Sequence, residues 1–184
     1  MSQYIRSYTQ GATYFFTLVA HDRRKIFCEK DFLQAFKHSI KRVQQQEPFE
    51  ILAWVQLPDH LHCIWQMPND EANYSRRWSK IKRFTTQACP QYQLPIEDLD
   101  YSKVKRNERG LWQRRFFEHQ IKDEADFFRC MNYLHYNPVK HGLVSRVRDW
   151  RYSSFHRHVK EGTYPVDWGA DVVDFSEDFL RGLE

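Results

Sequence analysis

Apolar and polar residues follow two different periods along the chain, and their succession predicts a domain built of both strands and helices. Residues 14–20 (YFFTLVA) are aromatic or β-branched almost throughout, which is typical of a buried strand. Residues 31–46 predict an amphipathic helix, which Pro48 closes. Its apolar side chains fall on one helical stripe, namely Phe32, Leu33, Phe36, Ile40 and Val43.

A hairpin and a second helix are expected next. Residues 50–56 (EILAWVQ) and 60–67 (HLHCIWQM) predict two strands, because the turn signal Leu57-Pro58-Asp59 separates them. Residues 75–88 have a helical pattern, and residues 90–100 are interpreted as a loop.

The end of the predicted domain is one more strand followed by one more helix. Residues 110–120 (GLWQRRFFEHQ) hold the fourth strand. Asp123 is a good N-cap for a helix that runs to about Tyr136. Asn137-Pro138 is expected to end that helix, because the residue before a proline is pushed out of helical geometry.

The order strand, helix, strand, strand, helix, strand, helix is the split βαβ arrangement of a ferredoxin-like fold. We therefore expect an α+β sandwich with an antiparallel sheet. A length of 184 residues suits one such domain with a short addition. Residues 1–145 are assigned to the domain, and residues 146–184 to a C-terminal appendage with an acidic tail.

Composition narrows the class of protein. No apolar run is long enough to cross a bilayer, and the polar first ten residues lack the apolar core of a signal peptide, so a cytoplasmic protein is expected. The cysteines are spaced too irregularly for a zinc ribbon or a compact disulfide framework. We interpret them as reduced, mostly buried thiols: Cys28, Cys63, Cys89 and Cys130.

Charge is distributed unevenly along the chain. Residues 161–184 contain seven acids and one base, so this segment carries a charge of −6. Since the whole chain has a net charge of +4, the rest of the chain carries +10. A basic body with an acidic tail suits a domain that binds a polyanion. An ordinary basic protein with a solvated tail has the same distribution, so charge alone does not decide between them.

His60 and His62 are the clearest candidates for chemistry. Alternate residues of a strand point to the same face, so the two imidazoles can bind one metal ion together. Leu61, Cys63 and Trp65 then point to the opposite face and pack against helices. The alternative is a pair of partly exposed histidines in a hairpin without a metal, because short motifs often match a sequence by chance.

Tyr133 and Asn137 are the second candidate pair. They are four residues apart and therefore share one face of the last predicted helix. The carboxamide oxygen of Asn137 can complete a metal site, with the hydroxyl of Tyr133 within reach of whatever the metal binds. The alternative is a tyrosine of the core. His119, near the end of the fourth strand, is a further histidine that merits a test.

Two basic segments suggest a nucleic acid as the polyanion. Cations for phosphates and aromatic rings for unstacked bases are what single-strand binding requires. Trp78 and Trp112 are expected to be core residues, so the cations are the stronger indication. The first segment contains Arg76, Arg77, Lys80, Lys82 and Arg83, and the second contains Lys103, Lys105, Arg106, Arg109, Arg114 and Arg115.

Several stretches resemble a known family of transposases. LPDHLHCIW (57–65) resembles the histidine–hydrophobic–histidine strand of the HUH single-strand transposases. RRFFEHQIKDEADF (114–127) is similar to the segment that leads to their catalytic helix. YLHYNPVKHGLV (133–144) and WRYSSFHRHV (150–159) resemble the REP-associated tyrosine transposases within that group.

The resemblance implies a ferredoxin-like fold, a Mg²⁺ or Mn²⁺ cofactor and one catalytic tyrosine. The metal-binding histidines carry over onto His60 and His62, and the nucleophile onto Tyr133. The third ligand falls on Asn137, where many relatives have a glutamine that is one methylene longer. Many relatives have asparagine before the first histidine, and this chain has Asp59, which can reach the metal or cap the turn.

The resemblance also implies a reaction and a substrate. The tyrosine attacks single-stranded DNA beside a palindromic hairpin of the repetitive extragenic type, leaving a 5′-phosphotyrosine and a free 3′-hydroxyl that can reseal the strand. A monomer and a homodimer both remain open. The side chains expected to contact DNA are Arg76, Arg77, Lys80, Lys82, Arg83, Arg114, Arg115 and Lys140.

Two rival interpretations remain. A non-catalytic nucleic-acid-binding module of ferredoxin-like fold would have no use for His60, His62 and Tyr133 together. A zinc hydrolase would need a third strong ligand, such as a cysteine pair or an HExxH helix, which the sequence lacks.

Overall fold

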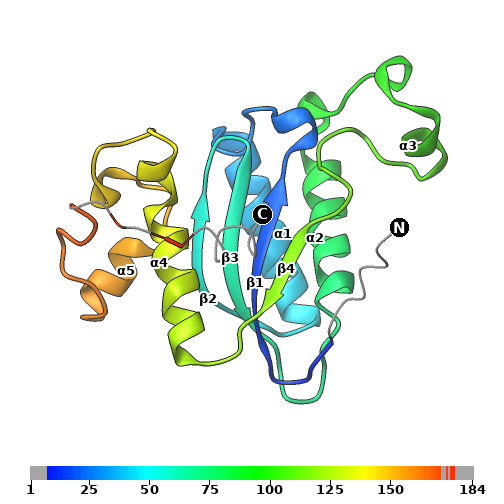
Figure 1. Cartoon of the computed structure of the whole chain (residues 1–184). Helices are drawn as coiled ribbons and strands as arrows, with labels where there is room; N and C mark the ends of the chain where they lie inside the picture. The colour runs from blue at the N-terminus through cyan, green and yellow to red at the C-terminus, as the bar shows by residue number, and fades with distance from the viewer. Residues whose placement is uncertain (1–7, 171–172, 174, 177–184) are drawn as a thin grey trace.

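A sheet of four antiparallel strands forms the centre of the computed structural model, which describes residues 8–170, 173, 175 and 176 (Figure 1). The strands lie in the order β2-β3-β1-β4. They are β1 (Thr13–Val19), β2 (Glu50–Gln56), β3 (His60–Gln66) and β4 (Phe117–Gln120). The long helices are α1 (Lys30–Gln46), α2 (Tyr74–Ala88) and α4 (Glu124–Lys140). The predicted ferredoxin-like α+β sandwich is thereby confirmed.

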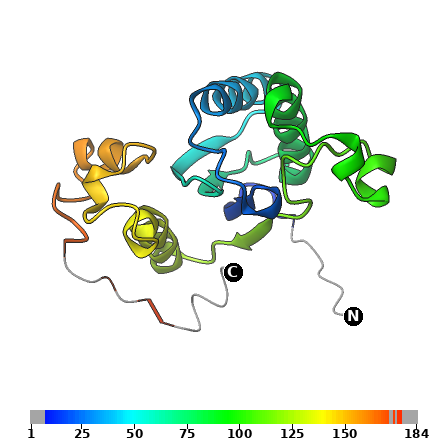
Figure 2. The ribbon, with the colours of Figure 1, turned by 90° about the horizontal axis from the view of Figure 1, so that it is seen from above.

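The central strand β1 is apolar except for Thr13 and Thr17, because both of its faces are covered. Tyr14, Phe16 and Leu18 point toward α1 and α2, while Phe15 points toward α4. Figure 2 shows the helices on the two sides of the sheet. Fully burying a large apolar side chain contributes roughly 1.5–3 kcal/mol, so this strand stabilises both layers at once.

Strand β3 lies between β1 and β2, so hydrogen bonds hold its backbone on both edges. His60 is paired with Val19 of β1, and His62 is paired with Thr17. Its alternate residues Leu61, Cys63 and Trp65 enter the core against α1 and α2, as the alternation predicted. Both histidines therefore face α4 from the most firmly held part of the sheet.

Residues 90–110, between α2 and β4, form a projection that we call the arm (Figure 1). Its short helices are η2 (Pro90–Tyr92), η3 (Ile96–Asp98) and α3 (Tyr101–Lys105). A hydrogen bond of 3.0 Å from the backbone N–H of Leu94 to the carbonyl of Arg109 closes its base. The arm contains the loop expected at residues 90–100 and extends it by ten residues.

The fourth strand is shorter than the expected span of residues 110–120. The regular ladder with β1 begins at Thr17 opposite Phe117, and an isolated bridge joins Ala20 to Trp112. Between these two pairings the chain advances three residues on β1 and five on the other side. The two additional residues interrupt the ladder, which leaves only Phe117–Gln120 as a strand.

The predicted end of the last helix at Asn137-Pro138 is wrong, because α4 continues to Lys140. Proline removes its own N–H donor, but the carbonyl of Asn137 still accepts the N–H of His141 at 3.0 Å. Asn137 and Pro138 are both buried against the sheet. Packing of this helix therefore outweighs the local preference of the residue before proline.

The real end of α4 is a glycine cap. Gly142 has φ +66°, the N–H of Leu143 donates to the carbonyl of Pro138 at 2.9 Å, and the N–H of Gly142 donates to Val139 at 2.9 Å. These two bonds form a Schellman motif, in which the left-handed residue is usually glycine.

Beyond α4, the described residues up to 170 pack onto the same face of the sheet as α4. They include η4 (Val147–Asp149) and α5 (Phe155–Lys160). Val147, Phe155 and Tyr164 share a core with α4 and β2. The domain boundary expected at residue 145 stays a prediction. Within the described ranges, no helix is both long enough and apolar enough to span a membrane.

We expect Gly142→Ala to lower the free energy of unfolding by about 1–2 kcal/mol, because an L residue is strained at this φ. A Cβ at this position would meet nothing within 4 Å, so the cost is one of backbone conformation alone. Gly142→Asn is the matched variant, and it should lose less because asparagine tolerates the left-handed region. Equal losses for both variants in guanidinium unfolding would contradict this account.

Candidate active site

His60 and His62 lie side by side at the interface between the sheet and α4. Their ring centroids are 5.1 Å apart, and the residues are 5% and 3% exposed. The pleat of β3 places both rings on the same face, so they can bind a single ion.

Each imidazole uses Nδ1 for a hydrogen bond within the protein. His60 Nδ1 lies 2.7 Å from Asp59 Oδ1, and His62 Nδ1 lies 2.8 Å from Thr17 Oγ1. Burial would raise the pKa of Asp59, but hydrogen bonds from His60 and Arg23 lower it to about 2, so this carboxylate is charged. Partners of this kind fix the orientation and tautomer of a metal-binding histidine and leave Nε2 for the metal.

Helix α4 brings Tyr133 and Asn137 to the same place. The ring of Tyr133 lies 5.5 Å from the ring of His62 between centroids. Tyr136, the neighbouring tyrosine of the helix, packs against Trp168 instead of the histidines. The spacing of four residues therefore places Tyr133 and Asn137 on the same face of α4, as helix geometry predicts.

Buried polar atoms without a partner gather at this point. His62 Nε2 and both amide atoms of Asn137 are buried and make no well-formed hydrogen bond to the described residues. Leaving such an atom unsatisfied costs about 1–3 kcal/mol. A divalent cation would accept the ring nitrogen and the carboxamide oxygen as ligands, so the residues present fit such an ion.

The protonation state of His62 also suits a metal ligand. Burial lowers the pKa of His62 well below its usual value, and the nearby His60 and His141 act in the same direction. The adjacent amide of Asn137 has a smaller, opposing effect. His62 is therefore neutral at neutral pH, which is the form that binds a metal.

The last turn of α4 adds a cation to the site. Lys140 Nζ lies 3.3 Å from the hydroxyl oxygen of Tyr133 and 4.8 Å from the centroid of its ring. This contact exists because α4 continues past Pro138, which places Lys140 two turns after Tyr133 on the same face. The ring of His141 lies 5.0 Å from that of His60.

The hydroxyl-bearing ring of Tyr133 is covered. Tyr133 is only 2% exposed, and Phe175 packs edge-on against it with centroids 5.5 Å apart. Phe175 belongs to the acidic segment 161–184, most of whose last fourteen residues lie outside the described ranges. Deleting residues 167–184 and measuring cleavage would test what the acidic segment does.

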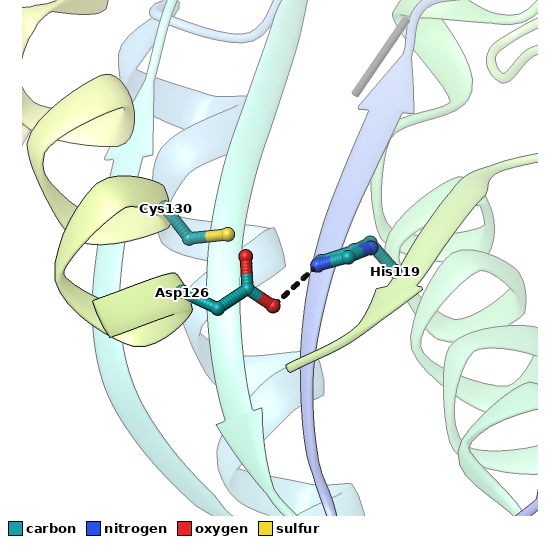
Figure 3. A group of neighbouring side chains, drawn as sticks. All are labelled: His119, Asp126 and Cys130. Atoms are coloured by element: carbon teal, nitrogen blue, oxygen red, sulfur yellow. Dashed lines mark hydrogen bonds and ion pairs between the residues drawn. The ribbon is translucent and has the colours of Figure 1, made fainter. Parts of the chain in front are cut away.

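His119 belongs to a separate cluster with Asp126 and Cys130, shown in Figure 3. Its Nε2 lies 2.8 Å from Asp126 Oδ2, which also accepts the N–H of Lys122 at 3.0 Å. Burial, reinforced by the charge of Asp126, raises the pKa of the Cys130 thiol to about 12. The cluster joins β4 to the first turns of α4, on the stripe that carries Tyr133 two turns later.

Arg77 does not belong among the expected DNA contacts. It is 1% exposed, and its guanidinium donates to the carbonyl oxygens of Glu47, Pro48 and Asn73. These carbonyls lie at the end of α1 and the start of α2, so Arg77 ties the two helices together. The predicted DNA contact of Arg77 is wrong, because its guanidinium is buried and is hydrogen-bonded to backbone carbonyls inside the protein.

The other basic side chains of α2 differ in their partners within the protein and in their exposure. Arg76 and Lys80 both pair with Glu47, which comes from the end of α1. Lys82 donates to the carbonyl of Gln113 at 2.8 Å, and Arg83 is exposed.

Arg114 and Arg115 follow the arm. Arg114 pairs with Glu108 at 2.8 Å, whereas Arg115 is exposed and has no ion pair with a carboxylate in the described ranges. Glu108 lies within the second basic segment, whereas the acids that pair with Arg76 and Lys80 lie outside the run of bases in α2, which is why that run looks unopposed in the sequence.

Sequence reasoning missed Thr17 and Arg23, which support the two histidines through hydrogen bonds. Thr17 stands in an ordinary buried strand, and Arg23 in a polar turn. Neither has a signal in the sequence, because only the strand register brings Thr17 to His62, and only the folded turn after β1 brings Arg23 to Asp59.

Comparison with known proteins gives consistent matches. Residues 8–137 match the family described as Transposase IS200 like. A REP-associated tyrosine transposase of Escherichia coli (strain K12) is 42% identical over 176 residues, which cover 96% of each chain. A protein of Haemophilus influenzae assigned to the same group is 44% identical over 173 residues, which cover 93% of this chain and 95% of the relative.

A solved structure gives the same result. A REP-associated tyrosine transposase bound to a REP hairpin superposes on this chain with a TM-score of 0.79, at 41% identity and over 96% of both chains. The chain therefore belongs to the IS200-like transposases and, within them, to the REP-associated tyrosine transposases that its histidine strand and tyrosine helix resemble.

Proposed function

We propose that the protein cleaves and rejoins single-stranded DNA beside palindromic hairpins, with Tyr133 as the nucleophile. The observation that carries this proposal is the meeting of His62 Nε2 and the Asn137 amide, both buried without a partner, with the ring of Tyr133. A non-catalytic binding module would leave these unsatisfied atoms without a use.

In the cleavage step the hydroxyl oxygen of Tyr133 bonds to the scissile phosphorus and loses its proton. The bond from phosphorus to the 3′ oxygen breaks, and that oxygen takes up a proton, leaving a 5′-phosphotyrosine and a free 3′-hydroxyl. A divalent cation, when bound, would neutralise the phosphate oxygens and orient the phosphorus for in-line attack. Rejoining reverses the step and consumes no ATP, because the phosphotyrosine keeps the phosphodiester energy.

Lys140 serves the same step from the side of the helix. An ammonium 3.3 Å from the hydroxyl oxygen stabilises negative charge that develops on this oxygen as its proton leaves. Asp59 and Thr17 keep His60 and His62 in place during the step.

Two groups of residues compete for the role of metal site. His60, His62 and Asn137 leave atoms unsatisfied, whereas Asp126 already accepts hydrogen bonds and Cys130 keeps its proton at neutral pH. A thiol is also a poor ligand for Mg²⁺ or Mn²⁺, which prefer oxygen and tolerate imidazole. We therefore assign the ion to the first group.

The DNA partner is inferred from the relative that was solved with a REP hairpin. We propose a hairpin of the same kind for this chain, with contacts from side chains that are at least partly exposed. These are Arg76, Lys80, Lys82, Arg83, Arg114, Arg115 and Lys140.

Tyr133→Phe should abolish the covalent protein–DNA adduct and reduce cleavage roughly a thousandfold or more, because the attacking oxygen is gone. The measurement is incubation with end-labelled hairpin DNA and Mn²⁺, followed by denaturing electrophoresis. Tyr136→Phe is the matched control, since its ring packs away from the histidines, and it should keep the adduct. An adduct that survives Tyr133→Phe would refute the assignment.

His62→Ala and Asn137→Ala should each weaken Mn²⁺ binding about tenfold or more, because each removes a ligand. Cys130→Ala is the control that disables the rival cluster, and it should bind Mn²⁺ like the unaltered protein. Binding is followed by the loss of the free Mn²⁺ signal in electron paramagnetic resonance. Loss of binding in Cys130→Ala, with His62→Ala unaffected, would move the ion to the cluster of His119.

A further inference from the structure

A second cluster of side chains able to bind a metal lies where α4 meets β4, apart from the histidine pair of β3. It consists of His119 of β4 and of Asp126 and Cys130 of α4 (Figure 3). Each offers one nitrogen, oxygen or sulfur atom, and no two of these atoms are more than 4.8 Å apart. The reaction proposed for Tyr133 uses none of these three side chains.

Strand and helix geometry bring the three side chains together. Asp126 and Cys130 are four residues apart and therefore share one face of α4. His119 is paired with Phe15, which packs on the α4 side of the sheet, so the imidazole points toward the same helix. Asp126 and Cys130 are buried, whereas the side chain of His119 is 23% exposed. An ion can therefore reach the cluster from the side of His119.

The three donor atoms identify the kind of ion. Zn²⁺ binds a cysteine sulfur at about 2.3 Å, an imidazole nitrogen at about 2.0–2.1 Å and a carboxylate oxygen at about 2.0–2.2 Å. Ca²⁺ takes about six to eight oxygen ligands, and a thiolate is a poor ligand for Mg²⁺ and Mn²⁺. One sulfur, one nitrogen and one oxygen therefore favour Zn²⁺.

The spacing of the donor atoms suits this ion after a small adjustment. With these bond lengths, two ligands of one tetrahedral Zn²⁺ are about 3.3–3.6 Å apart. His119 Nε2 and Asp126 Oδ2 are hydrogen-bonded at 2.8 Å, so they need to separate by about half an ångström. Three protein ligands leave the fourth position to water, as in zinc sites that have three protein ligands.

The charges of the ligands also suit a divalent ion. Burial would raise the pKa of Asp126, but hydrogen bonds from the backbone N–H of Lys122 and from His119 lower it, so the carboxylate is charged without the ion. Cys130 is a free cysteine, and a metal that binds it displaces the thiol proton to solvent. A carboxylate and a thiolate together neutralise the two positive charges of the ion, as a buried position requires.

The carboxylate has a second partner that can stay in place when the ion binds. The backbone N–H of Lys122 donates to Asp126 Oδ2 at 3.0 Å. The ion takes the place of the proton between His119 and Asp126, and the imidazole then carries its proton on Nδ1. The bond from Lys122 remains and orients the carboxylate, as hydrogen bonds to metal-binding carboxylates do.

We propose that His119, Asp126 and Cys130 bind one Zn²⁺ ion, which clamps the start of α4 to β4. The strand β4 has four residues and lies at the edge of the sheet, so few backbone hydrogen bonds hold it. A coordinated ion ties this short strand to the helix that carries Tyr133. The role is structural and needs no DNA, so it goes beyond the proposed function and does not depend on it.

Co²⁺ is the probe for this site, because it can replace Zn²⁺ and a thiolate bound to it gives a charge-transfer absorption in the near ultraviolet. The reduced full chain is titrated with Co²⁺ without DNA. The absorption should reach a plateau at one thiolate-bound ion per chain, vanish when Zn²⁺ is added and persist in millimolar Mg²⁺. Absence of the thiolate absorption, or its loss to Mg²⁺, would overturn the proposal.

Cys130→Ala should abolish the absorption, and His119→Ala should weaken Co²⁺ binding about tenfold or more, since each removes a ligand. Cys89→Ala is the matched control, because Cys89 is also free and fully buried but lies at the end of α2. It should keep the absorption and the affinity of the unaltered protein. An absorption that survives Cys130→Ala, or an affinity that His119→Ala leaves unchanged, would assign the ion elsewhere and refute the site.

Thermal unfolding gives a second measurement that does not rely on absorption. In the His62→Ala protein, whose histidine pair is disabled, Zn²⁺ at about a hundredfold its dissociation constant should raise the Tm by about 5–10 °C. With Cys130→Ala added, the same Zn²⁺ should raise the Tm by less than about 2 °C. Equal rises in the two proteins would contradict the clamp. Neither measurement uses DNA or the tyrosine hydroxyl, so failure here is distinct from failure of the proposed function, which the adduct assay decides.

Discussion

The packing of α4 against the sheet is the constraint on which the rest of the site depends. One stripe of this helix faces the sheet, and it carries Asp126, Cys130, Tyr133 and Asn137 in turn. The first of these joins β4 through His119, and the last two meet the histidine pair of β3. The same burial that docks the helix therefore also aligns a nucleophile and an amide with two imidazoles.

Much of this arrangement follows from periodicity alone. A period of two in β3 is enough to place His60 beside His62, and a period of 3.6 is enough to place Tyr133 above Asn137. The order of elements then leads to the ferredoxin-like sheet, in which β3 is central. The sequence alone cannot show that the helix face and the strand face meet, and the family resemblance supplied that step.

Other features could not be predicted because distant segments decide them. Arg77 looks like its basic neighbours in the sequence, but three carbonyls at the junction of α1 and α2 bind it. Asn137-Pro138 has the local signature of a helix end, and burial against the sheet overrides it. Thr17 becomes a partner of His62 only through the register of β1 and β3. In each case tertiary packing outweighs a local preference.

The placement of Tyr133, Asn137 and Lys140 on one helix has a consequence for how this chain can vary. Successive residues of an α-helix are rotated by about 100°, since there are 3.6 of them in a turn. One residue inserted between Tyr133 and Asn137 would turn the amide well away from the histidines while the helix still formed. The arm, in contrast, can change length without disturbing the helix register. Insertions and deletions should therefore be tolerated between α2 and β4 and excluded from the second half of α4.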